Sequence, residues 1–254
     1  MREDLVTVKG RRLHFREAGE GRPVVLVHGN TGSSRWFVRI EEIPGVRFIA
    51  PDLPNFGESD GIGAVEIDEY AAYLLAFLDA LSIRTATVVG HSLGGAVAMS
   101  LALSNPQRVT RLLLIDSAPI AGLVTPEEHY PAIEQYRANR QLLAQALRFV
   151  VPHLSDERFF EELVDDAQRM HPDAFVGNAR ALARYDYTKE AGRFDRPVLF
   201  IVGAEDVLVT EAMAQETARS FPLGRSRTLP GVGHSVIVED PRLFREILAD
   251  FLAE

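Results

Sequence analysis

Short, continuous apolar runs recur along the chain, with longer amphipathic stretches between them. The first run, residues 24–27, reads Val-Val-Leu-Val and is bounded by Pro23 and Gly29. A run that is apolar at every position suits a strand whose two faces are both buried, as in a parallel sheet. Runs of the same kind occupy residues 46–50, 86–89, 112–115 and 198–202, and a weaker one occupies 225–229. The pattern predicts a series of buried strands.

The stretches between these runs carry apolar residues at the three- and four-residue spacing of helices, at 68–81, 94–104, 210–221 and 241–252. Strands that alternate with helices predict a mostly parallel sheet with right-handed crossovers. Ahead of them, residues 5–8 and 13–17 flank Lys9-Gly10-Arg11, which indicates a hairpin. The expected fold class is α/β, with a mostly parallel central sheet flanked by helices. Ligands of such sheets bind beyond the carboxyl ends of the strands.

One long segment interrupts this alternation. Residues 119–194 contain no buried-strand pattern and are rich in Glu, Gln, Arg and Ala, with helical stretches at 133–149 and 156–170. We interpret this segment as a helical cap that is inserted into a single core domain made of residues 1–118 and 195–254. A set of ordinary surface helices is the alternative.

Composition narrows the possible functions. The 254 residues carry a net charge of −9 and no basic stripe, which argues against a nucleic-acid partner. The chain has no cysteine, so disulfides, thiolate metal sites and a cysteine nucleophile are excluded. No apolar run reaches the roughly 18 residues that a membrane span needs, and the first residues lack the apolar core of a signal peptide. We therefore expect a cytoplasmic protein without a membrane partner. Its oligomeric state stays open.

The strongest chemical signal is Gly90-His91-Ser92-Leu93-Gly94, which follows the buried run at 86–89 and opens a predicted helix. A G-x-S-x-G motif between a strand and a helix forms a sharp turn that exposes the serine hydroxyl. The amides at the start of the helix then face the same point. We expect Ser92 to be a nucleophile and the Leu93 N–H to be an oxyanion donor.

A serine hydroxyl needs a base, and His234 is the best candidate because it follows the last predicted strand in a glycine-rich loop, Gly231-Val232-Gly233. The competing histidines lie in the hairpin, in the cap or directly before the serine: His14, His129, His153, His171 and His91.

The base in turn needs a carboxylate that holds its tautomer. Asp206 follows the run at 198–202 and is the preferred acid. Glu205 beside it and Asp116, which ends the run at 112–115, are the competitors.

The order serine, aspartate, histidine along the chain is typical of α/β-hydrolases. Over nearly its whole length the sequence resembles this family, and more specifically a serine carboxylesterase with a helical cap. The resemblance implies an α/β-hydrolase fold. It also implies that in His28-Gly29-Asn30 the Asn30 N–H is the second oxyanion donor, and that His28 supports the loop.

Residues 52–59 resemble the D-L-P-G-x-G-x-S loop of the same family, with Asn55 in place of a glycine. Asparagine tolerates a positive φ better than most residues, so the exchange is mild. Phe56 in this loop is expected at the edge of the substrate pocket. Trp36 and Phe37 either line an acyl pocket or pack the first helix against the sheet.

These residues together predict hydrolysis of a small-molecule carboxylic ester through an acyl-enzyme on Ser92, with no metal and no organic cofactor. The alternatives are a meta-cleavage C–C hydrolase, for which Arg180 or Arg184 of the cap would bind the anionic substrate, a lactonase, and a cofactor-free haloperoxidase or perhydrolase. Outside the enzymes, the alternative is a small-molecule receptor. The acyl and alcohol preference depends on how the cap packs and is not predicted.

Overall fold

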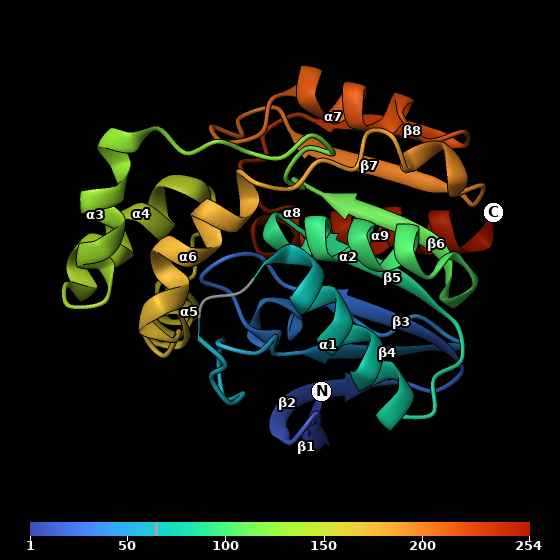
Figure 1. Ribbon diagram of the computed structural model, residues 1–254, viewed down its shortest axis with the longest axis horizontal. Helices are drawn as coiled ribbons and strands as arrows, with labels where there is room; N and C mark the ends of the chain where they lie inside the picture. The colour runs from blue at the N-terminus through green and yellow to red at the C-terminus, as the bar shows by residue number, and fades with distance from the viewer. Residues whose placement is uncertain (64–65) are drawn as a thin grey trace.

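The computed structural model describes residues 1–63 and 66–254. Within them, eight strands form one sheet in the order β1-β2-β4-β3-β5-β6-β7-β8 (Figure 1). The strands are β1 (Arg2–Val8), β2 (Arg11–Ala18), β3 (Arg22–Val27), β4 (Val46–Pro51), β5 (Ala86–His91), β6 (Val109–Ile115), β7 (Val198–Gly203) and β8 (Gly224–Leu229). β2 runs antiparallel to both its neighbours, and every other pairing is parallel. The predicted mostly parallel sheet is confirmed.

The strand order reverses around β3. From β3 the chain crosses to β4 on one side, and from β4 it returns to β5 on the other side of β3. The connections that leave β3 and β5 therefore diverge, and sheets of this kind bind ligands at such a reversal, beyond the carboxyl ends of the strands. The Asn30 loop and Ser92 follow β3 and β5 directly, so the topology brings them to the same edge of the sheet.

Alternate residues of the central strands enter two separate apolar layers. Val25 and Val27 of β3 belong to one layer, whereas Val24 and Leu26 belong to the other. The first layer is covered by α1 (Ile67–Ala80), α2 (Leu93–Ser104) and α7 (Glu211–Arg219). The second is covered by η1 (Ser34–Phe37), α8 (Val236–Glu239) and α9 (Pro241–Ala253). Burial of both faces explains why these strands are continuously apolar in sequence.

The edge strand β8 differs from the central ones, because Arg225, Ser226 and Arg227 are exposed. Polar and charged side chains on an edge strand discourage pairing with another chain. This position at the edge accounts for the weaker apolar pattern of residues 225–229.

Between β6 and β7 the chain forms the helices α3 (Tyr130–Tyr136), α4 (Arg140–Val150), α5 (Glu157–Gln168) and α6 (Pro172–Leu182), which lie beyond the carboxyl ends of the strands (Figure 1). The single helix expected at 133–149 is wrong. The chain instead turns, and Asn139 begins α4 by accepting a hydrogen bond from the Leu142 N–H at 3.0 Å. An N-cap inside an apolar repeat thus divides it into two helices.

Apolar contacts and ion pairs attach the helices between β6 and β7, called the cap from here on, to the rest of the chain, called the core. Leu143, Leu147 and Phe160 join the second apolar layer, whereas Phe175 and Leu182 of α6 join the first. Ion pairs that cross from the core to the cap include Arg35–Asp166, Arg39–Asp156, Arg169–Glu58 and Arg184–Glu66. In the part of the chain that the structure describes, none of the helices has the length and apolar character needed to cross a membrane.

Candidate active site

Ser92 sits in a strained turn between β5 and α2. Its φ is 53° and its ψ is −119°, a backbone conformation that non-glycine residues rarely adopt. Three backbone hydrogen bonds hold the turn: Ser92 N–H to the Ile115 carbonyl at 3.0 Å, and the amides of Gly95 and Ala118 to the Ser92 carbonyl at 2.9 and 3.1 Å. Strain of this kind persists only where the surroundings fix it, and it marks functional positions.

The glycine of the motif that follows Ser92 is required by close backbone contact. A Cβ on Gly94 would overlap the carbonyl oxygens of Val27 and His28 at the end of β3. Because no side chain intervenes, α2 begins directly beside β3 and aims its first amides at Ser92.

His234 reaches Ser92 from the loop after β8. Its Nε2 lies 2.9 Å from the Ser92 Oγ, and its Nδ1 lies 2.7 Å from the Asp206 Oδ2. An Nδ1–H that donates to the carboxylate leaves the Nε2 lone pair free to accept the serine proton. The cap contributes as well, because the backbone N–H of His234 donates to the Val150 carbonyl at the end of α4, at 2.9 Å. The structure thus brings together the three residues that the sequence singled out.

Asp206 is stabilised as an anion. Its Oδ1 accepts hydrogen bonds from the amides of Leu208 and Val209 at 2.7 and 3.1 Å. Burial by itself would raise the pKa of Asp206, but the hydrogen bond from His234 and these amides outweigh it, so the pKa lies below its usual value.

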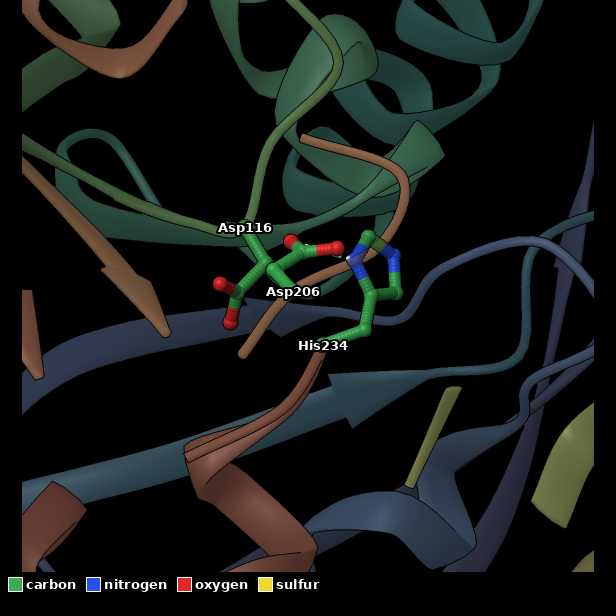
Figure 2. Close-up of side chains that lie close together, drawn as sticks. All are labelled: Asp116, Asp206 and His234. Carbon is green, nitrogen blue, oxygen red and sulfur yellow. Dashed lines mark hydrogen bonds and ion pairs between the residues drawn. The ribbon is translucent and has the colours of Figure 1, made fainter. Parts of the chain in front are cut away.

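Asp116, one of the two competitors, lies next to Asp206 (Figure 2). It is 1% exposed, its φ is 44°, and its Oδ1 accepts from the Gly203 N–H at 2.8 Å. Its Oδ2 is buried without a hydrogen-bond partner among the described residues other than the neighbouring acid. Burial, together with the charge of Asp206, raises the pKa of Asp116 well above its usual value. Asp116 therefore holds its proton more readily than an exposed aspartate does, next to the hydrogen-bonded pair of Asp206 and His234.

The other competitor, Glu205, points to the surface. Its Oε2 lies 2.7 Å from the Nε2 of His153 in the cap. Of the three carboxylates that the sequence offered, only Asp206 is hydrogen-bonded to His234 among the described residues.

Asp116, Asp206 and His234 each offer one possible metal-ligand atom within 4.8 Å of the others. The atoms of Asp206 and His234 already have protein partners, because Asp206 Oδ2 accepts from His234 Nδ1 and Asp206 Oδ1 accepts from two amides. A proton on Asp116 is enough to explain how two carboxyl groups come this close.

Residues 28–30, here called the oxyanion loop, pack directly against the nucleophile. A Cβ on Gly29 would lie 2.9 Å from the Cβ of Ser92. His28 ties the loop down: its Nδ1 bonds the Gly29 carbonyl at 2.8 Å, and its Nε2 accepts from the Leu53 N–H at 3.0 Å. Burial lowers the pKa of His28, so it stays neutral in this supporting position. Asn30 follows Gly29 directly and is half-buried.

The aromatic residues expected at the pocket lie instead in the core. Trp36, Phe37 and Phe56 are 2%, 0% and 1% exposed. Trp36 stacks on the ring of His91 with centroids 5.1 Å apart, and Phe56 packs edge-on against His28 at 4.8 Å. Their apolar area therefore supports the loops of the site from behind. For Trp36 and Phe37 the structure favours the packing interpretation.

Asn55 adopts φ 77°, which confirms the positive φ inferred from its replacement of a glycine. Sequence reasoning missed its partners Tyr70 and Asn178, which form a buried hydrogen-bond network with it. The asparagine in a glycine position was a signal for Asn55, whereas Asn178 lies in an amphipathic helix and has no distinguishing pattern.

A profile described as "alpha/beta hydrolase fold" matches residues 22–241. Curated relatives include a 2-hydroxymuconate semialdehyde hydrolase of Pseudomonas putida, 27% identical over 98% of this chain and 93% of the relative, and Esterase YbfF of Escherichia coli, 29% identical over 90% and 93%. The crystal structure of the enol-lactonase from Burkholderia xenovorans LB400 superposes with a TM-score of 0.88 at 25% identity and covers 99% of this chain and all of that one. With this match, this fold and this serine turn, the chain is a hydrolase of the alpha/beta hydrolase family.

Proposed function

We propose that the protein hydrolyses carboxylic esters through an acyl-enzyme on Ser92. The observation that carries the proposal is the continuous hydrogen-bonded line from the Ser92 Oγ through His234 to Asp206, at 2.9 and 2.7 Å. A hydroxyl that is bonded to an oriented imidazole is the arrangement that activates serine for attack.

In the first step Ser92 Oγ attacks the ester carbonyl carbon while its proton passes to His234 Nε2. Negative charge develops on the carbonyl oxygen, and the N–H groups of Leu93 and Asn30 donate to it. The imidazolium then gives its proton to the leaving alcohol as the C–O bond breaks. Asp206 stabilises the imidazolium throughout and keeps its own negative charge.

In the second step a water molecule attacks the acyl carbon, and His234 takes its proton. The tetrahedral species collapses, the proton returns to the Ser92 Oγ, and the carboxylic acid leaves. The oxyanion donors act in both steps, each worth about 3–4 kcal/mol where such donors have been removed. The Leu93 amide belongs to the first turn of α2, where amides have no acceptor within their own helix and the dipole adds positive potential.

The surroundings of the cap arginines favour an uncharged ester over an anionic substrate. Arg184 Nε bonds Glu66 at 3.0 Å, and Arg180 lies over the ring of Tyr130 at 5.6 Å. A dianionic meta-cleavage substrate would have to displace these contacts. The second candidate is nevertheless C–C hydrolysis, the alternative that the sequence left open, and the Pseudomonas putida relative is by name a 2-hydroxymuconate semialdehyde hydrolase. Lactone hydrolysis needs the same steps with a cyclic ester.

The test measures turnover of p-nitrophenyl esters of graded chain length, a lactone series and a meta-cleavage product by the wild type, Ser92→Ala and Ser104→Ala. Ser104 is also on α2, at its far end, and serves as the matched control. We expect Ser92→Ala to lose ester turnover and Ser104→Ala to keep it. Equal ester rates in the wild type and Ser92→Ala would refute the mechanism, and a preference for the C–C substrate would select the second candidate.

A further inference from the structure

A chain of buried polar side chains connects the cap to the oxyanion loop. Asn178, on α6, donates from Nδ2 to Asn30 Oδ1 at 2.8 Å. Tyr70, on α1, donates from its hydroxyl to Asn178 Oδ1 at 2.9 Å, and Asn55 donates from Nδ2 to the Tyr70 hydroxyl at 3.1 Å. Asn178, Tyr70 and Asn55 are 1%, 0% and 2% exposed. Groups this deeply buried depend on one another for hydrogen bonds, which makes the chain rigid.

The backbone sets the direction of every bond in this chain. Asn55 Oδ1 accepts from the Ile62 N–H at 2.7 Å, and its Nδ2 also donates to the Gly63 carbonyl at 2.7 Å. A backbone N–H can only donate and a carbonyl can only accept, so the Asn55 amide has a single orientation. The Tyr70 hydroxyl therefore accepts from Asn55 and must donate onward. Asn178 Oδ1 accepts the hydrogen bond from Tyr70, so its Nδ2 faces the oxyanion loop and donates to Asn30.

Tyr70 is well suited to transmit this direction. Burial raises its pKa above the usual value, so the hydroxyl keeps its proton near neutral pH. A second contact ties the loop at residues 52–59 to the cap, because the His171 N–H donates to the Asn55 carbonyl at 2.8 Å just before α6 begins. Backbone groups of the core and of the cap thus both hold Asn55, where the network begins.

We propose that Asn178 is a positioning residue that holds the oxyanion loop in its reactive geometry through the side chain of Asn30. The backbone N–H of Asn30 is the proposed second oxyanion donor, so this inference rests on the proposed function. A donor acts on a transition state only where it is already aimed, and a displacement of about 1 Å is enough to cost a large part of the rate. The cap then supports the chemistry itself, in addition to covering the site.

The predicted effect falls on kcat. Asn178 supports a donor to the charge that appears only in the transition state, so its loss should leave ground-state binding, and hence KM, nearly unchanged. The same contact is lost whether Asn178 or the side chain of Asn30 is removed. The two losses should therefore overlap rather than multiply.

The experiment measures kcat and KM for a p-nitrophenyl ester in full-length wild type, Asn178→Ala, Asn30→Ala and the double variant. We expect each single variant to lower kcat by roughly 10- to 100-fold with little change in KM. The kcat of the double variant should equal that of the single variant with the lower kcat. Asn178→Asp keeps an acceptor for Tyr70 but cannot donate to Asn30, so it should also lose kcat. It provides a second folded variant if Asn178→Ala is unstable.

The control is Asn139→Ala. It removes the side-chain hydrogen bond that begins α4, which belongs to the same group of helices as α6, and Asn139 makes no contact with the oxyanion loop among the hydrogen bonds of the described residues. It should lower the midpoint of thermal unfolding and leave kcat unchanged. Wild-type kcat in a folded Asn178 variant would overturn the proposal. Multiplicative losses in the double variant would do the same.

A second readout does not depend on ester turnover. A fluorophosphonate phosphonylates an activated serine and expels fluoride, and the adduct is followed by intact mass. The developing charge on its phosphoryl oxygen needs the same donors. If Ser92 is labelled but no ester is cleaved, the proposed function fails while the labelling rates of the Asn178 variants still decide this inference. If esters are cleaved and Asn178→Ala is labelled at the wild-type rate, the inference fails alone.

Discussion

The loops after β6 and β7 place two aspartates side by side, and their surroundings shift the pKa values of the two carboxyl groups in opposite directions. Asp206 receives hydrogen bonds from His234 and from two backbone amides, all of which stabilise a negative charge. Asp116 is fully buried, receives one hydrogen bond from the Gly203 amide, and lies next to the Asp206 charge. Two carboxyl groups this close share one charge at lower free energy than they hold two. The local donors decide which one keeps it.

The largest expected effect comes from Asp206→Asn. The amides of Leu208 and Val209 should keep the new carbonyl oxygen, which turns the NH₂ group toward His234 Nδ1. Nδ1 then becomes an acceptor and Nε2 carries the proton, so His234 cannot act as a base. We expect kcat for a p-nitrophenyl ester to fall by about 10⁴-fold. A loss below tenfold would mean that Asp116 takes over the negative charge, and that the two aspartates do not differ in the way described above.

Asp116→Ala should act mainly on stability. It removes the acceptor of the Gly203 N–H and leaves that buried amide without a partner, a loss that costs about 1–3 kcal/mol. Urea unfolding of Asp116→Ala and the wild type measures it. Asp116→Asn, which keeps a carbonyl oxygen for the same amide, is the matched control and should lose much less. Equal losses in both variants would show that the hydrogen bond from Gly203 contributes nothing.

The two aspartates should also give opposite dependences of stability on pH. The pKa of Asp116 is raised by folding, so its contribution to stability is complete below the unfolded pKa of about 3.9 and is lost as pH rises toward the folded pKa. The pKa of Asp206 is lowered, so its contribution is present above about 3.9 and is lost as pH falls through the folded pKa.

The measurement is the free energy of unfolding in urea from about pH 4 to about pH 9, for the wild type and Asp116→Asn. The variant cannot lose a proton at this position, so its stability relative to the wild type should increase with pH. Parallel curves for the two proteins would show that Asp116 ionises alike in the folded and unfolded states.

The smallest expected effect is that of Asp116→Asn on activity. A neutral carboxyl group and an amide have nearly the same shape, and both donate a hydrogen bond to the Asp206 carboxylate while accepting one from Gly203. We expect kcat and its pH profile to stay close to those of the wild type. A shift of the pH profile would reveal that the proton on Asp116 tunes the basicity of His234.

Much of the fold and part of the site follow from local sequence patterns. The apolar runs predicted the central strands because a strand buried on both faces must be apolar throughout. The G-x-S-x-G motif placed Ser92 on a turn because its glycines permit backbone contacts that side chains forbid. The break between α3 and α4 was missed, since a helical repeat of apolar residues runs through a capping asparagine without a visible interruption.

Local patterns in the chain were therefore enough to define the sheet, the serine turn and the three candidates for the acid, because each depends on neighbours a few residues away. The choice between Asp206 and Asp116 required the folded chain, because both follow buried strands and differ only in the groups that other loops bring to them. The folded chain also buries the side chains of Trp36, Phe37 and Phe56 in the core. It brings Asn178 within hydrogen-bond distance of Asn30, 148 positions away in sequence. Contacts between distant segments set burial and hydrogen-bond partners, and these are absent from any local pattern.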